Sequence, residues 1–142
     1  MTTYAARETI NAPVETIRKL LTDASSYPEW NPTIVSLDGT IALGEKITLV
    51  STVNPKRSFT LKITSLDAPR RMVWADGMPL GLFKGVRTYL LEPRGDGATD
   101  FSMEEVFSGI LEPMISKSIP DMSDPFQQFA AGLKREAERS RD

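Results

Sequence analysis

Two side-chain types common in enzyme active sites are missing, since this chain of 142 residues contains no cysteine and no histidine. Thiolate nucleophiles, disulfides, cysteine metal sites and Ser-His-Asp triads are therefore excluded. The commonest general base and zinc ligand is lost with histidine. Any reaction must use carboxylates, Lys, Arg, Tyr, Ser or bound water. No nucleotide or metal motif occurs, so we expect no cofactor and no metal.

Glu105 is the first candidate for chemistry, because it alternates with apolar residues in a strand-like segment. Adjacent side chains of a strand point to opposite faces. Glu105 therefore shares a face with apolar neighbours, and Glu104 must point the other way. The two glutamates do not form a paired-carboxylate site. The apolar residues on the Glu105 face are Phe101, Met103 and Phe107.

Arg87 and Tyr89 share a face in the preceding strand-like segment. If the intervening glycines form a three-residue hairpin loop, Arg94 pairs with Ala98, and the register places Arg87 opposite Glu105. The sequence thus predicts an ion pair across the hairpin, with head groups within about 4 Å. We interpret it first as an internal salt bridge; a ligand anchor or an acid/base pair are the functional alternatives.

The remaining candidate site residues are apolar or aromatic. Trp74 alternates with Met72 and is expected in or beside a cavity, where its indole N–H needs a partner. We expect the same cavity to be lined by side chains from three segments: Phe59, Leu61, Phe101, Met103, Phe126 and Phe129.

An apolar hairpin tip, "DGMPLGLFKG", is the predicted cavity entrance or partner contact. Folding back onto the sheet is the alternative. Its three glycines precede no helix, so the tip is not a phosphate-binding loop. Nearby apolar residues of 114–122 could add to the entrance. The entrance residues of the tip are Met78, Leu80, Leu82 and Phe83.

The element order indicates an α+β fold. Residues 2–10 alternate as a strand, 11–23 form an amphipathic helix with Pro13 at its first position, and 25–30 add a helical turn. Six further strands follow between 33 and 108, separated by turn signals such as "NPKR" at 54–57 and "DAPR" at 67–70. A short or irregular helix at 111–124 precedes a long one capped by Asp124. This predicts a seven-stranded antiparallel sheet around a C-terminal helix.

The segment "SSYPEWNP" at 25–32 is the predicted corner between the short helices and the sheet. Pro28 and Pro32 limit the helical turn and favour extended geometry before each proline. We expect Tyr27 and Trp30 to be its apolar anchors.

Charge and composition are those of an ordinary globular domain, with 40% hydrophobic and 25% charged residues and a net charge of −2. The interleaved charges argue against nucleic-acid binding. We expect no membrane span, a cytoplasmic location and a monomer or homodimer. No repeat or linker divides residues 1–142, which predicts a single domain.

Five short motifs, taken in order, resemble the START-like or SRPBCC superfamily, with its helix-grip fold, and within it the bacterial polyketide cyclase/dehydrase and lipid-transport group. The resemblance implies a deep apolar cavity roofed by the long helix. Many relatives have histidine on the penultimate strand, where this chain has Arg87. The motifs are "INAPVETI" (10–17), "EWNP" (29–32), "MVW" (72–74), "GVRTYLLEPRGDGATDF" (85–101) and "EEVFSG" (104–109).

The expected function is binding of a small hydrophobic molecule, such as a lipid, a polyketide or an aromatic compound. Tyr89, Arg87, Glu105 and Trp74 would orient the ligand. One alternative is a cyclase or dehydratase in which Glu105 or Tyr89 transfers protons. The other is a protein-interaction module, like relatives that activate a heat-shock chaperone, which would have a small or filled cavity.

Overall fold

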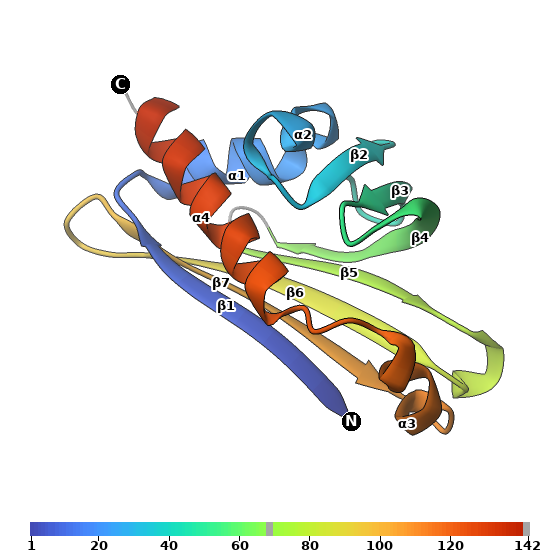
Figure 1. Cartoon of the computed structure of the whole chain (residues 1–142). Coiled ribbons are helices and arrows are strands. Elements are labelled where there is room, and N and C mark those ends of the chain that lie inside the picture. Colours follow the sequence, from blue (N-terminus) through green and yellow to red (C-terminus); the bar gives the residue numbers. More distant parts are fainter. Residues whose placement is uncertain (68–69, 141–142) are drawn as a thin grey trace.

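The computed structural model describes residues 1–67 and 70–140. Within them, seven strands form one antiparallel sheet in the spatial order β1-β7-β6-β5-β4-β3-β2 (Figure 1). Strands β2 to β7 form a meander, and β1 closes the far edge beside β7, which confirms the predicted sheet. The strands are β1 Thr2–Ile10, β2 Ile34–Asp38, β3 Lys46–Ser51, β4 Asn54–Asp67, β5 Arg71–Gly77, β6 Lys84–Pro93 and β7 Thr99–Ser108.

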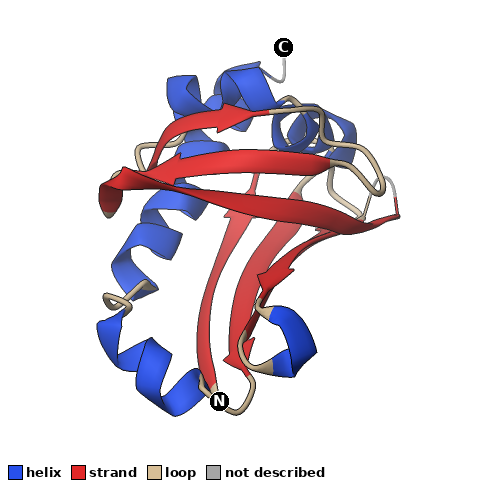
Figure 2. Ribbon diagram, turned by 90° about the vertical axis from the view of Figure 1, so that its right-hand side faces the viewer, coloured by secondary structure: helices blue, strands red, loops and turns tan. Residues whose placement is uncertain are grey.

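The helices lie on one side of this sheet. The sheet is strongly bent, so that β2, β3 and β4 cross the direction of the other strands, and α4 runs along its open side beside β1 (Figure 2). This is the predicted α+β helix-grip arrangement. The helices are α1 Val14–Thr22, α2 Tyr27–Trp30, α3 Glu112–Ile115 and α4 Ser123–Ser140, with short 3₁₀ turns at Ala24–Ser26, Pro79–Gly81 and Ser116–Ser118.

Helix α4 buries one apolar face against the sheet, as its sequence pattern predicts. Spacing of three and four residues places these side chains on one stripe. Outside this stripe the helix carries the ion pairs Lys134–Glu138 and Glu136–Arg139, and Lys134 also donates to the Thr9 carbonyl of β1. The buried stripe consists of Phe126, Phe129, Ala130, Leu133 and Ala137.

Two predicted helix starts were wrong, by two residues for α4 and by one for α1. Helix α4 begins at Ser123, and its first turn is capped from upstream, because Asp121 Oδ1 accepts a 2.9 Å hydrogen bond from the Ser123 N–H. Asp124 therefore lies inside the first turn and bonds Gln128 instead. Pro13 precedes α1 rather than opening it. The predicted irregular helix before α4 is α3 with its following 3₁₀ turn.

The turn predicted at "NPKR" was also wrong, because β4 begins at Asn54 and the chain reverses just before it. Ser51 pairs directly with Asn54, whereas Val50 pairs with Ser58. Residues 55–57 lie in this register shift, where Pro55 is not required to donate an N–H to the β3 ladder. A bulge therefore accommodates the turn-like residues within a strand. Another predicted turn, at 67–70, lies partly outside the described residues.

The corner at 25–32 is held by buried aromatic residues, as predicted. Tyr27 Oη donates a 2.6 Å hydrogen bond to the Leu21 carbonyl, and Trp30 Nε1 donates one of 3.1 Å to Ser26 Oγ. The corner also rests on the backbone of α4. A Cβ atom at Gly132 would lie 2.3 Å from the Trp30 carbonyl oxygen, so only glycine permits this approach.

Candidate functional site

A cavity of about 450 Å³ lies between the inner face of the sheet and the N-terminal half of α4. This volume is within the range of small-molecule sites. Its mouth is formed by exposed residues at the start of β4, in the β5–β6 loop and before α4, among them Arg57, Met78 and Pro120. The wall is mainly apolar and includes Ile34, Leu49, Leu61, Phe107, Ile119, Phe126 and Phe129.

The structure brings eight of the fourteen predicted site residues to this cavity. They come from β4, the β5–β6 loop, β6, β7 and α4, which the bent sheet brings together. Their role in holding a ligand stays a prediction. The eight residues are Phe59, Leu61, Met78, Phe83, Arg87, Glu105, Phe126 and Phe129.

Four predicted cavity residues lie instead in the core beside the cavity: Trp74, Tyr89, Phe101 and Met103. Trp74 packs on Tyr89 with ring centroids 4.9 Å apart, and Tyr89 stacks on Phe129 at 5.5 Å. Tyr27 from the corner reaches the same cluster. These rings fill one end of the space between sheet and helix, which confines the cavity to the other end. The Trp74 indole N–H has no hydrogen-bond partner among the described residues.

Only two of the four predicted entrance residues line the cavity. Met78 and Phe83 line the cavity, whereas half-buried Leu82 does not, and Leu80 is 94% exposed. Phe83 stacks on Phe107 with centroids 5.6 Å apart, so this part of the loop folds back on the sheet. Leu80 also has a left-handed backbone, with φ of 61°. Ile115, Ile119 and Met122 supply the rest of the apolar mouth.

The predicted ion pair between Arg87 and Glu105 is confirmed. Arg87 Nε and Nη2 donate to Glu105 Oε1 at 3.0 and 2.8 Å, and Arg87 Nη1 donates to Tyr89 Oη at 3.3 Å. The register pairs Arg87 with Glu105 and Arg94 with Ala98, as the hairpin argument required. Arg87 also lies over the Phe126 ring, 4.9 Å from its centroid. Glu104 is exposed on the other face.

These contacts fix the protonation states around the pair. Burial lowers the pKa of Arg87, but the Glu105 carboxylate and the Tyr89 hydroxyl together raise it by more than burial lowers it. The net shift of this pKa is upward, so Arg87 stays charged. Burial raises the pKa of Tyr89 to about 12, although Arg87 opposes this shift. Tyr89 is therefore a neutral hydrogen-bond partner at pH 7.

Asp76 is a cavity residue that the sequence interpretation missed, because it was assigned to the turn "DGMPLG". It is the penultimate residue of β5 and shares the inner face with Trp74. That parity was the signal available in the sequence. Burial, followed by the nearby Glu105 carboxylate, raises the pKa of Asp76. Arg57 is a second missed residue; it lies at the mouth, 5.0 Å from the Phe59 ring centroid.

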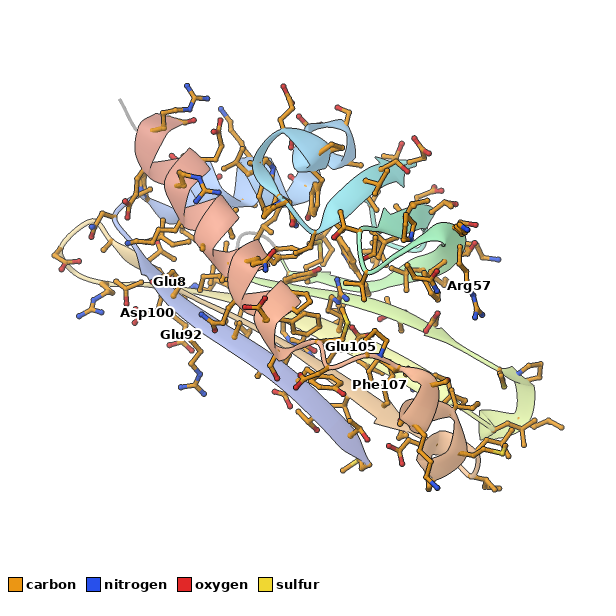
Figure 3. The ribbon with its side chains drawn as sticks, in the orientation of Figure 1. Glu8, Arg57, Glu92, Asp100, Glu105 and Phe107 are labelled. Carbon is orange, nitrogen blue, oxygen red and sulfur yellow. The ribbon has the colours of Figure 1, made fainter. Side chains whose placement is uncertain are left out.

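The charged residues of the cavity lie far from the charged residues at the other end of the sheet. Figure 3 shows Glu105 and Phe107 below the segment that leads into α4, while Arg57 extends from the edge of the molecule. Glu8, which has inward parity on β1, lies at the opposite end of the sheet with Glu92 and Asp100 and is not part of the cavity wall. The charged residues that line the cavity are therefore Arg87, Glu105 and Asp76 in its wall and Arg57 at its mouth.

Residues 1–138 match the sequence pattern of the family described as polyketide cyclase / dehydrase and lipid transport. The match spans nearly all of the chain. The chain belongs to this family. Curated proteins, in contrast, contain no match to it.

Solved structures with the polyketide cyclase/dehydrase fold agree with this assignment. The Zhui aromatase/cyclase from Streptomyces sp. R1128 has a TM-score of 0.76 at 13% identity, covering 97% of this chain and 94% of its own. A START superfamily protein from Mycobacterium smegmatis has a TM-score of 0.69 at 14% identity, covering 96% and 97%. At these identities the likeness shows the fold alone, and it confirms the START-like resemblance.

The di-domain aromatase/cyclase BexL, from the BE-7585A biosynthetic pathway, has a TM-score of 0.72 at 17% identity. The alignment covers 97% of this chain but 47% of BexL, so this member of the polyketide cyclase/dehydrase family spans about half of that protein. Among the described residues, no helix is long and apolar enough to cross a bilayer.

Proposed function

We propose that the chain binds a small hydrophobic molecule in the cavity between the sheet and α4. The observation that carries the proposal is the cavity itself: about 450 Å³, mainly apolar, and reached from the surface through an apolar mouth. Burial of apolar ligand surface supplies about 25 cal/mol per Å², from which the costs of association are subtracted. Family membership supports a lipid, polyketide or aromatic compound as the class of ligand.

The aromatic cluster supports binding of a compact ligand. Tyr27, Trp74, Tyr89 and Phe129 already fill one end of the sheet–helix space. A ligand entering at the mouth would therefore stop against this cluster, beside Arg87 and Glu105. Phe126 would cover it from α4, because its ring lies over Arg87.

The cyclase or dehydratase alternative is favoured by one observation, the presence of two carboxylates, Asp76 and Glu105, at the cavity wall. It is weakened by the state of the other proposed proton carriers. Glu105 is tied to Arg87 through two hydrogen bonds, and Tyr89 stays protonated at neutral pH. An enzyme of this kind would depend on Asp76 for proton transfer.

The interaction-module alternative requires a small or filled cavity, and the cavity found here is neither. Exposed Leu80 still offers a surface contact, but it does not line the cavity. Ligand binding is therefore the function that the geometry supports best.

A thermal-shift titration with methyl decanoate, an apolar ester without a hydrogen-bond donor, tests the proposal. At a ligand concentration of 100 Kd the expected stabilisation is about 2.7 kcal/mol. For a domain of this size that corresponds to a rise in Tm of about 8 °C. No shift with any apolar compound would contradict the proposal.

Adjacent positions on β2 provide a matched pair of variants. Ile34 is buried and lines the cavity, whereas Val35 is 48% exposed and faces outward. The Ile34→Trp variant should lose the ligand-induced shift because the indole occupies cavity volume. The Val35→Trp variant should keep it. Equal shifts in both variants would place the ligand elsewhere.

A further inference from the structure

One inward-facing position, Gly85, has no side chain although its neighbours Asp76, Glu105 and Phe107 line the cavity, and we call this position the notch. On the inner face, Asp76 of β5 pairs with Gly85 of β6, and Gly85 pairs with Phe107 of β7. In the next row, Trp74, Arg87 and Glu105 are paired in the same way. Every position of these two rows carries a side chain except Gly85.

Two carboxylates border this notch. A Cβ atom at Gly85 would lie 3.2 Å from Asp76 Oδ1 and 3.3 Å from Glu105 Oε2, with Phe107 Cε1 at 3.2 Å. Gly85 has no left-handed backbone that would require glycine. The two carboxylate oxygens that point toward Gly85 therefore lie close to each other, with an aromatic ring beside them. One hydrogen-bond donor of a ligand, placed in the cavity between these oxygens, would reach both carboxylates.

The oxygens that face the notch are not occupied by the protein. Arg87 and its two hydrogen bonds are on Oε1 of Glu105, which leaves Oε2 without a donor among the described residues. No donor in the same part of the chain bonds the Asp76 carboxylate. No group of three potential metal ligands forms there, so the described residues do not build a metal cage at this place.

Arg87, the buried positive group beside these carboxylates, already donates hydrogen bonds within the protein. Each of the three guanidinium nitrogens of Arg87 donates a hydrogen bond, to Glu105 or to Tyr89. The Asp76 carboxylate and Glu105 Oε2 are therefore acceptors in the cavity wall to which the described residues donate no hydrogen bond. A buried acceptor gains most from a donor that the ligand supplies, and a charge-assisted bond is the stronger kind.

We infer that the notch at Gly85 selects ligands with a hydrogen-bond donor at the head of an apolar body, a hydroxyl or a protonated amine, which Asp76 and Glu105 accept together. This inference rests on the proposed function and narrows its ligand class. A free carboxylic acid is disfavoured, since its anion would face two carboxylates. Arg57 at the mouth is the competing anchor for such an anion.

Four ligands with the same ten-carbon chain test the inference by isothermal titration at pH 7: 1-decanol, decylamine, decanoate and methyl decanoate. The donor-bearing decanol or decylamine should bind about tenfold or more tightly than decanoate and the ester, since a hydrogen bond to a charged group contributes about 1.5–3 kcal/mol. The Gly85→Ala variant should lose this preference while keeping its affinity for the ester, because the methyl group fills the notch.

Control variants separate the outcomes. Glu104→Gln lies on the outer face of the same strand and should leave the preference unchanged. Equal binding of all four ligands, or a preference that persists in Gly85→Ala, would overturn the inference while the binding function stands. Tightest binding of decanoate that disappears in Arg57→Gln would also overturn it. Failure of all four to bind would instead contradict the proposed function.

Discussion

The Arg87–Glu105 pair gives the most quantitative prediction of stability. Arg87 is 9% and Glu105 8% exposed, and two hydrogen bonds join them at 3.0 and 2.8 Å. The Glu105→Gln substitution leaves the Arg87 charge without its counter-charge inside the protein. Breaking a buried pair in this way costs about 3–5 kcal/mol. Because both residues line a cavity with an open mouth, we expect the lower end, about 3 kcal/mol.

Urea unfolding at pH 7, followed by circular dichroism, measures this cost directly. A parallel thermal melt should show a Tm lower by about 10 °C. The Glu104→Gln variant is the matched control, since Glu104 is exposed and its substitution should change stability by no more than about 0.5 kcal/mol.

An apolar replacement of both partners completes the test. The Arg87→Met/Glu105→Leu double variant removes both charges and should recover most of the lost stability, because apolar residues of similar volume replace buried ion pairs at little cost. A Glu105→Gln variant as stable as the parent would refute the conclusion that the two charges are buried and stabilise each other. A double variant less stable than Glu105→Gln would refute it as well.

Three further substitutions test other parts of the structure. Gly132→Ala should destabilise the protein by about 1–3 kcal/mol in urea unfolding, because its methyl group meets the Trp30 carbonyl at 2.3 Å; a stabilised variant would contradict this contact. Asp76→Asn should stabilise the protein at pH 7. Burial and then Glu105 raise the Asp76 pKa, so the folded state binds this proton more tightly and the stability of the parent protein falls as pH rises through that pKa. The Tm of Asp76→Asn should therefore exceed that of the parent at pH 7, and this difference should vanish near pH 3. A difference that grows toward pH 3 would contradict the upward direction of the pKa shift. Phe129→Ala should cost about 3–5 kcal/mol, since the ring is fully buried among aromatic neighbours; a loss below about 1 kcal/mol would show a looser core.

Much of the fold could be predicted from local patterns. Strand alternation around Glu105 fixed which glutamate faces inward, and the hairpin loop fixed its register against Arg87. The alternation and the hairpin register both depend on residues close together in the sequence, so they could be predicted from it. The turn at "NPKR" was mispredicted because a bulge in β4 tolerates a proline, and the bulge depends on the pairing with β3.

The cavity outline could not be predicted in the same way. Trp74 and Tyr89 have the inward parity of cavity residues, but the corner at 25–32 brings Tyr27 onto Trp74 and helps to fill that end of the sheet. This contact joins segments far apart in the chain. Asp76 was missed for a local reason, because an Asp-Gly pair is typical of turns, whereas here it ends a strand.

The central claim is that an apolar ligand occupies the space between the sheet and α4. Intermolecular NOEs between methyl decanoate and the methyl groups of the protein test it most directly. The account predicts NOEs to Ile34, Leu61 and Ile119, which line the cavity. NOEs confined to exposed Leu43 and Leu80, or none at saturating ligand, would contradict it.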